Sequence, residues 1–266
     1  MSAFFQHAGA FLASLGVEHF MEPPFVHFVQ RQLSFHLVDL QAVSHPTLFQ
    51  DLSIHYEQRG VRLVHLWEDV YTLKTDLVQN RIRALLGESV RIFARNTELQ
   101  RLDQTVLNDF LAAHHLQGAT QAKYKYGLFH KGELAAVASF SAGRPMVRKG
   151  KTCQSYELIR FASRSGHTVT GGLSKLLNAF IQEVQPDDMM TYADRDWSLG
   201  QSYEQLGFTF IENTPPQAFL IHPQTMLRYY PHRLPEGSSS EELLAKGYIM
   251  IYNAGNKKYL SLQDNY

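Results

Sequence analysis

Residues 156–208 constrain the fold more than any other stretch, because strand and helix patterns alternate along them. An apolar strand that begins at Tyr156 leads into a glycine-bearing loop, and the loop opens an amphipathic helix. A second strand pattern follows at 189–192, and a short helix ends in the letters YEQLGF at 203–208. This order places backbone amides and a helix N-terminus beside the carboxyl end of a strand, where a phosphorylated ligand can be held.

The helix at 173–184 has the clearest pattern in the chain. Its apolar residues fall at i, i+3, i+4, i+7, i+8 and i+11, which forms one continuous stripe. Pro186 ends it, because proline cannot continue a helix. Similar stripes predict helices over 71–86 and 99–115.

Strand patterns alternate with these helices. The run 60–67 alternates apolar and polar residues at period two, as a half-buried strand does. Two apolar runs, 126–130 and 135–141, flank the short polar connection 131–133, which predicts a hairpin. Further strands are predicted at 89–94, 154–162, 208–211 and 218–222. The alternation predicts the α/β (α+β) class, with a mixed twisted sheet flanked by helices.

The length of 266 residues favours more than one structural unit. We expect a small α/β unit at 1–88, a larger domain at 89–232, and a linker with a C-terminal tail at 233–266. The linker is indicated by two prolines, a glycine and three serines within 231–240. In the tail, Ser239 and Glu242 have the spacing of a helix capping box, and the residues after them predict a final hairpin formed by 247–252 and 258–262.

Composition excludes several classes of protein. The 25 lysines and arginines balance the 25 aspartates and glutamates, so no overall positive field attracts nucleic acid or an anionic membrane. Cys153 is the single cysteine, which excludes an internal disulfide. No apolar run approaches the roughly 20 residues of a spanning helix, and the first residues lack a secretion-signal pattern, so we expect a cytoplasmic protein without a membrane partner. The 13 histidines show no metal-ligand spacing beyond the adjacent pair at 114–115, and no metal site is predicted.

The loop 164–172 is the candidate phosphate site. Glycines allow backbone N–H groups to approach a ligand, and the following helix adds the positive end of its dipole. The candidate residues for binding are Arg164, Gly166, Gly171, Gly172, Ser174 and Lys175. A turn that needs glycine only for its geometry is the alternative, and the loop has neither the P-loop nor the Rossmann spacing.

The whole order from strand to glycine loop, helix, strand and YEQLGF ending resembles the GNAT superfamily of acyl-CoA-dependent N-acyltransferases. The resemblance covers about 90–222, and the ending is similar to the Y-x-x-x-G-F of that superfamily, with Tyr203 as its tyrosine. The loop is longer than the usual Q/R-x-x-G-x-G/A form. The resemblance implies a GNAT-like sheet and acetyl-CoA or another acyl-CoA as co-substrate.

Within the superfamily the chain resembles Mom-type nucleobase modifiers and phage proteins that join a GNAT unit to a nuclease-like segment. The letters YELIR at 156–160 are similar to their E-L-x-R strand, and TYAD at 191–194, followed by Gly200 and Tyr203, is similar to their S/T-Y-A-D stretch. Residues 65–69 faintly resemble the last strand of a Vsr-like nuclease. No carboxylate and lysine set accompanies them, so nuclease activity is not predicted.

The resemblance implies direct acyl transfer in a sheet that splays between its fourth and fifth strands. A pantetheine arm would pair with the backbone near Ile159 and Phe161, and Tyr203 would protonate the departing thiolate. Glu157 is the candidate general base. Alternatively, Tyr203 is a core residue whose hydroxyl bonds to a backbone group. The alternative for Glu157 is an ion pair with Arg160 or Arg164.

The acceptor side is less specific. Asp194 is a candidate for orienting the acceptor amine, and Asp196 is either a second candidate or the N-cap of the next helix. Trp197 and Tyr192 are candidates for stacking an aromatic acceptor or for packing. The acceptor is expected to be a small-molecule or nucleobase amine. A nucleobase-modifying enzyme and an inactive nucleic-acid-binding protein are the alternatives, with the basic loop 144–151 as contact or as plain solvated connection.

Overall fold

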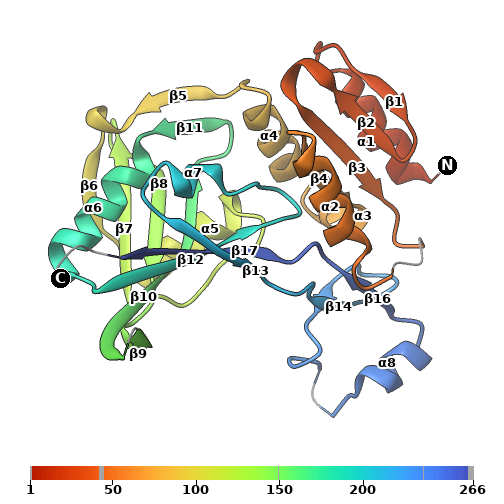
Figure 1. Cartoon of the computed structure of the whole chain (residues 1–266). Helices are drawn as coiled ribbons and strands as arrows, with labels where there is room; N and C mark the ends of the chain where they lie inside the picture. Colours follow the sequence, from red (N-terminus) through yellow and green to blue (C-terminus); the bar gives the residue numbers. More distant parts are fainter. Residues whose placement is uncertain (1, 42–44, 149, 236, 263–266) are drawn as a thin grey trace. The chain divides into compact units, whose positions relative to one another are not determined.

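The computed structural model describes residues 2–41, 45–148, 150–235 and 237–262, and it contains two compact units (Figure 1). The first unit consists of Met1–Thr75, Ala193–Gln201 and Glu212–Lys257. The second consists of Asp76–Tyr192, Ser202–Ile211 and Lys258–Tyr266.

This division differs from the expected contiguous parts 1–88, 89–232 and 233–266. The reason is a core that joins distant segments: Phe219, Ile221 and Ile251 are buried in one cluster with Phe49 and Trp67. Burying these large apolar side chains together outweighs the sequence distance between them, because each contributes about 1.5–3 kcal/mol on burial. Residues 212–257 therefore fold with the N-terminal segment.

The first unit contains two sheets. The four-stranded sheet has the order β1-β2-β3-β4, with β3 and β4 parallel, and the three-stranded sheet has the order β15-β14-β16. Its strands are β1 (Phe20–Glu22), β2 (Phe25–Phe28), β3 (Leu33–Val38), β4 (Arg62–Trp67), β14 (Ala218–Ile221), β15 (Arg228–Tyr229) and β16 (Ile249–Tyr252), and its helices are α1 (Ala3–Ala13), α2 (Leu48–Gln58), α3 (Glu68–Leu73) and α8 (Ser240–Ala245). The predicted capping box of Ser239 and Glu242 is confirmed at α8.

The second unit contains an eight-stranded mixed sheet. Its order is β13-β17-β12-β10-β8-β7-β6, with β9 paired to β10, and a separate two-stranded sheet joins β5 to β11. Its strands are β5 (Val90–Phe93), β6 (Glu98–Arg101), β7 (Tyr124–His130), β8 (Glu133–Phe140), β9 (Arg144–Arg148), β10 (Lys151–Ser163), β11 (His167–Thr170), β12 (Asp188–Asp194), β13 (Thr209–Asn213) and β17 (Asn256–Leu262), and its helices are α4 (Thr75–Leu85), α5 (Gln104–His114), α6 (Gly172–Val184) and α7 (Gln201–Glu204). The expected mixed α/β class is confirmed.

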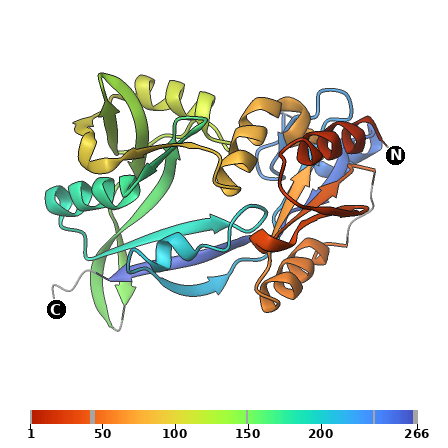
Figure 2. The ribbon, with the colours of Figure 1, turned by 90° about the horizontal axis from the view of Figure 1, so that it is seen from above.

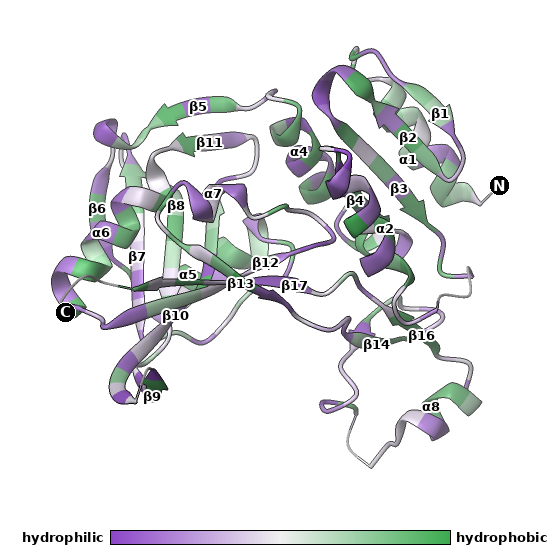
Figure 3. Cartoon of the chain, in the orientation of Figure 1, coloured by the Kyte–Doolittle hydropathy of each residue, from purple (hydrophilic) through white to green (hydrophobic). Residues whose placement is uncertain are grey.

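Helices cover both faces of the large sheet at its centre, where β8 is almost wholly apolar (Figures 2 and 3). On one face Phe180 of α6 stacks on Phe140 of β8, with ring centroids 4.0 Å apart. On the other face Leu107 and Leu111 of α5 pack against Val137 of β8. Since Phe140 and Val137 point to opposite sides of one strand, β8 is buried between two helices.

Two predicted helices are shorter than expected. The helix over 71–86 is interrupted at Lys74, whose backbone is not helical, and the Thr75 hydroxyl donates to the Tyr71 carbonyl over 2.8 Å. The helix over 99–115 begins only at Gln104. The residues before it form β6, which pairs with β7, and Asp103 caps the helix by accepting from the Val106 amide over 2.8 Å. Long-range pairing overrode the local periodicity in the second case.

Three strand predictions need correction. The run 60–67 forms β4, but five of its six residues are buried instead of every second one. Its edge also has a partner, since the His65 amide donates to the Asp196 carbonyl. The predicted final hairpin is wrong, since β16 pairs with β14 and β17 enters the large sheet. The basic loop 144–151 is instead the hairpin of β9 and β10, with residue 149 outside the described residues. Of the predicted linker, residue 236 also lies outside them.

The candidate phosphate loop is not one continuous loop. Residues 167–170 form β11, which pairs with β5 in parallel register. The predicted hairpin of 126–130 and 135–141 is confirmed as β7 and β8. Among the described residues, no helix is long and apolar enough to span a membrane.

Candidate active site

Strands β10 and β12 part in the middle of the large sheet. They pair in parallel from Ser155–Asp188 to Leu158–Thr191, whereas β10 continues to Ser163 without a further β12 partner among the described residues. The register of β10 against β8 also shifts between Leu158 and Arg160. Beyond this point the two strands run in different directions (Figure 1). We call the point after the Leu158–Thr191 pair the fork.

Tyr203 lies at the fork. Its side chain is hydrogen-bonded to that of Thr191, and the Thr191 hydroxyl in turn donates to the Leu158 carbonyl over 3.0 Å. The ring of Tyr203 contacts those of Phe208 and Tyr259, with centroids 5.9 and 5.6 Å away. The last strand pair and two aromatic rings therefore hold the phenol where β10 and β12 separate.

The environment of Tyr203 keeps its phenol protonated near neutral pH. Burial raises the pKa of the phenol above its usual value, while the positive charges of Arg81 and Arg160 lower it. The net direction is upward, so the group retains its proton. A protonated phenol beside two cations can donate that proton, because the phenolate that forms is stabilised by their charge.

Glu157 precedes the last strand pair by one residue. It is half-buried, and burial raises the pKa of its carboxyl, whereas the charges of Arg144 and Arg160 lower it. The alternative ion pair with Arg164 is not formed, because that guanidinium binds Glu133 instead, with Nη1 to Oε2 at 2.5 Å. Glu157 is thus a carboxyl with a raised pKa close to the fork in the chain.

Asp194 and Asp196 belong to the first unit and have structural partners there. The Asp194 carboxylate accepts from the Asp196 amide over 3.0 Å. Asp196 is buried and accepts from the Trp67 indole and the Ala254 amide, each over 2.9 Å. Its carboxylate is therefore engaged within the first unit, and the alternative prediction that it caps the following helix is wrong. Trp197 is only 5% exposed, which leaves little of its ring for stacking on an acceptor.

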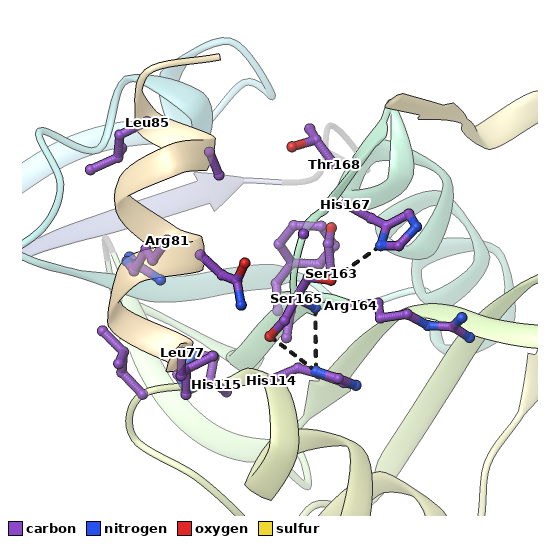
Figure 4. Close-up of a pocket in the computed structure, with 16 residues that line it drawn as sticks. Leu77, Arg81, Leu85, His114, His115, Ser163, Arg164, Ser165, His167 and Thr168 are labelled. Carbon is purple, nitrogen blue, oxygen red and sulfur yellow. Dashed lines mark hydrogen bonds between the residues drawn. The ribbon is translucent and has the colours of Figure 1, made fainter. Parts of the chain in front are cut away.

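A pocket of about 280 Å³ lies at the far end of β10 (Figure 4). Its walls are α4, the C-terminal end of α5, the last residues of β10, the turn 164–166 and the first residues of β11. Of the predicted cofactor residues, Phe161, Arg164 and Gly166 line this pocket, whereas Ile159 is at the register shift of β10. The Ile159 carbonyl accepts from the Arg160 side chain over 2.8 Å.

The other predicted cofactor residues do not line the pocket. Gly171 is the N-cap of α6 in a left-handed conformation, with φ +75°, and Gly172 packs so closely that an added Cβ would lie 2.9 Å from Val169. Ser174 lies in the first turn of the helix. Lys175 Nζ donates to the carbonyls of Ala94 and Thr97, over 3.0 and 2.5 Å. Lys175 therefore ties α6 to the segment after β5.

No model of a known protein family and no curated protein matches the chain, but solved structures do. Acetyltransferases are among them. A Corynebacterium glutamicum structure described as histone acetyltransferase HPA2 and related acetyltransferase is 15% identical, with a TM-score of 0.38, and the match covers 63% of this chain and 96% of that one. A Bacillus subtilis acetyltransferase in complex with CoA is 14% identical, with a TM-score of 0.39, over 63% of this chain and 99% of that one.

A GNAT family acetyltransferase from Brucella melitensis, in complex with acetyl-CoA, is 12% identical, with a TM-score of 0.33, over 42% of this chain and 82% of that one. TM-scores below 0.5 carry no argument about activity.

The basic segment 144–148 has protein partners for its two arginines. Arg144 contacts the Met190 sulfur over 3.1 Å, and Arg148 forms an ion pair with the buried Asp188. Asp188 also accepts from Ser155, so these contacts fasten the β9–β10 hairpin to β12. The described residues of this segment therefore have a structural role, because they hold the β9–β10 hairpin against β12.

Sequence reasoning missed two residues of the site. Arg81 lies on α4, outside the stretch that carries the family resemblance, yet it lines the pocket and its charge acts on Tyr203. His114 ends α5 and bonds to Ser165, 51 residues away in sequence. No local pattern marks either residue. The only available signal was the pair of adjacent histidines at 114–115.

Proposed function

We propose that the protein is an acyl-CoA-dependent N-acyltransferase that uses acetyl-CoA or another acyl-CoA and acts at the fork. The observation that carries the proposal is the parting of β10 and β12 with a protonated phenol at its vertex. These two are the fourth and fifth strands of the large sheet counted from β6, leaving out β9, which is where the GNAT resemblance expects a pantetheine arm.

In the proposed reaction, the acceptor amine attacks the thioester carbonyl carbon. A C–N bond forms and the C–S bond breaks. The proton of the attacking amine passes to the Glu157 carboxylate, directly or through water, and the departing thiolate takes the Tyr203 proton. Solvent then restores both groups. The nearby charges of Arg81 and Arg160 favour the transient phenolate.

The proposed acceptor is an amine of a small molecule or a nucleobase. Asp194 has no step in this scheme, because its carboxylate is engaged in the turn after β12. Nucleic-acid binding as a separate function has no supporting observation, since the arginines of 144–148 are held by β12. The first unit has no assigned role in the transfer.

Binding of acetyl-CoA tests the proposal directly. Acetyl-CoA at about 100 times its Kd should stabilise the protein by about 2.7 kcal/mol, which raises Tm by a few degrees. Differential scanning fluorimetry measures the shift, and thiol release with a panel of primary amines measures turnover. Free pantetheine is the matched control, since it lacks the phosphates. An unchanged Tm at millimolar acetyl-CoA contradicts the proposal.

Replacing Glu157 by glutamine should change the pH profile of the reaction. A general base works only when ionised, so wild-type kcat should fall as the pH falls through the raised pKa of Glu157. The variant should lose this acid limb and be about 10²-fold slower at neutral pH. The measurement is the steady-state kcat at a series of pH values between about 5 and 9. An acid limb that persists in the variant removes Glu157 from the mechanism.

A further inference from the structure

Two histidines form a buried pair in the core of the first unit. His36 of β3 is 8% exposed and His65 of β4 is fully buried, and they lie opposite each other in the parallel register of these strands. Their Nδ1 atoms are 3.1 Å apart. The His65 ring also reaches α2, where its Nε2 is 3.1 Å from the Phe49 carbonyl and 2.9 Å from the Ser53 hydroxyl. The pair therefore connects β3, β4 and α2.

The contacts of the two rings determine where their protons lie. A carbonyl oxygen only accepts hydrogen bonds, so Nε2 of His65 carries a proton and donates to the Phe49 carbonyl. Nδ1 of the neutral His65 ring is then an acceptor, and Nδ1 of His36 is the donor to it. A second proton on His65 would set two N–H groups against each other. A second proton on His36 would place a positive charge in the core.

Aromatic rings surround the pair and leave little water to solvate such a charge. The Phe25 ring stacks on that of His36 with centroids 4.6 Å apart, and the Phe49 ring lies 5.7 Å from His36 and 5.1 Å from His65. Burial lowers the pKa of His36 from 6.5 to about 4. Burial also lowers the pKa of His65, and positive charge on His36 or Arg195 lowers it further. Both rings are therefore neutral at pH 7.

The charged groups around the pair do not compensate a proton on either ring. The titratable groups on the neighbouring elements are Glu22 of β1, His27 of β2, Tyr56 and Glu57 of α2, Arg195 and Lys257. Glu57 forms ion pairs with Arg195 and Lys257, and Glu22 lies 3.9 Å from Nε2 of His27. Burial raises the pKa of Tyr56, so this phenol carries no charge near neutral pH. Within the described ranges of the chain, no ion pair reaches His36 or His65.

We propose that the His36–His65 pair is a pH-sensitive switch that holds α2 against β3 and β4 at neutral pH and releases it in acid. An unfolded chain returns both rings to the ordinary pKa of about 6.5, which lies above their pKa in the folded unit. The stabilisation is therefore complete above about pH 6.5. It is lost as the pH falls from there towards about 4, because the unfolded chain binds protons that the folded unit does not. The switch belongs to the first unit and does not depend on the transfer proposed at the fork.

Denaturant unfolding of the full chain at about pH 7.5 and about pH 5 tests the inference. Intrinsic fluorescence is the signal, because Trp67 and Trp197 both belong to the first unit. Each histidine of the pair should raise the unfolding equilibrium constant about 30-fold between these pH values, which makes about 10³-fold for both. In His36→Asn, whose amide can still donate to His65, about 30-fold of this rise should be lost.

Val38→Ala is the matched control. Val38 is 2% exposed on the same strand, so its truncation destabilises the core without removing a titratable group. This variant should keep the full wild-type rise between the two pH values. A rise in His36→Asn equal to that of wild type overturns the inference.

Two measurements on the wild type decide the matter if His36→Asn fails to fold. Long-range proton–nitrogen NMR spectra of a chain labelled at histidine should show His65 protonated at Nε2 and His36 at Nδ1, with no second proton on either ring above about pH 5. A second proton that binds the folded chain with a midpoint near about pH 6.5 overturns the inference. Hydrogen exchange, corrected for the intrinsic rate at each pH, should show α2 losing protection in acid, and unchanged protection of α2 overturns its release.

Discussion

Replacing Tyr203 by phenylalanine is expected to lower kcat by about 10²-fold to 10⁴-fold, the range that a general acid contributes. The affinity for acetyl-CoA should stay nearly constant, because the substitution removes only a hydroxyl and keeps the ring against Phe208 and Tyr259. Without the phenol the thiolate must leave unprotonated or take a proton from water. Steady-state kinetics and direct titration of the cofactor separate the two effects.

Tyr259→Phe is the matched control for that experiment. Tyr259 is fully buried in the same aromatic cluster, and its hydroxyl donates to Glu204 over 3.3 Å rather than to Thr191. It should lose little kcat. Equal losses in the two variants would mean that the cluster matters only for packing. Full activity of Tyr203→Phe would remove the general acid from the mechanism.

The sequence allowed the local parts of the second unit to be predicted. The apolar stripe of α6 and the hairpin of β7 and β8 are confirmed, because each depends on contacts between residues close in sequence. Tyr203 was singled out because the order of elements and the YEQLGF ending resemble the GNAT superfamily, and its phenol lies beside Thr191 at the fork. In these cases local propensity and tertiary structure agree.

Contacts between segments distant in the sequence could not be predicted from local patterns. Residues 167–170 looked like part of a glycine loop. They form a strand because they pair with β5, and the paired residues His167 and Val90 are 77 positions apart in the sequence. In the same way β14 and β16 complete a core whose other side is Trp67 and Phe49. Such pairings are decided by which apolar surfaces meet, and no window of the sequence contains both partners.

The candidate site shows the same limit. The strand that lines it, β10, was predicted with nearly its observed extent, but its register shift at Ile159 was not. His114 and Ser165 meet only when the end of α5 packs beside the turn after β10. A local motif can indicate where a strand ends. It does not contain the distant helix end that packs beside the strand and forms the pocket wall.

A buried ion pair links β15 to the start of α3 in the first unit. Asp69 is 1% exposed, and its carboxylate receives Nε and Nη2 of Arg228 over 2.5 and 2.8 Å. The guanidinium also lies over the rings of Trp67 and Phe219, about 5 Å from their centroids. Removing one partner of such a pair leaves the other buried without compensation, which costs more than the pair contributes.

Asp69→Ala should therefore destabilise the first unit by about 3–5 kcal/mol. Both tryptophans, Trp67 and Trp197, belong to this unit, so intrinsic fluorescence during denaturant unfolding reports on it selectively. Asp51→Ala, which removes an exposed carboxylate from α2, is the matched control and should change the free energy of unfolding by less than about 1 kcal/mol.

A double-mutant cycle extends this result. Asp69→Leu with Arg228→Met replaces both charges by apolar groups and should recover much of the loss, since no buried charge is then left alone. The recovery has a structural meaning, because Asp69 and Arg228 lie 159 residues apart in the chain. A coupling free energy near zero would contradict the packing of residues 212–257 on the N-terminal segment, and with it the division of the chain into these two units.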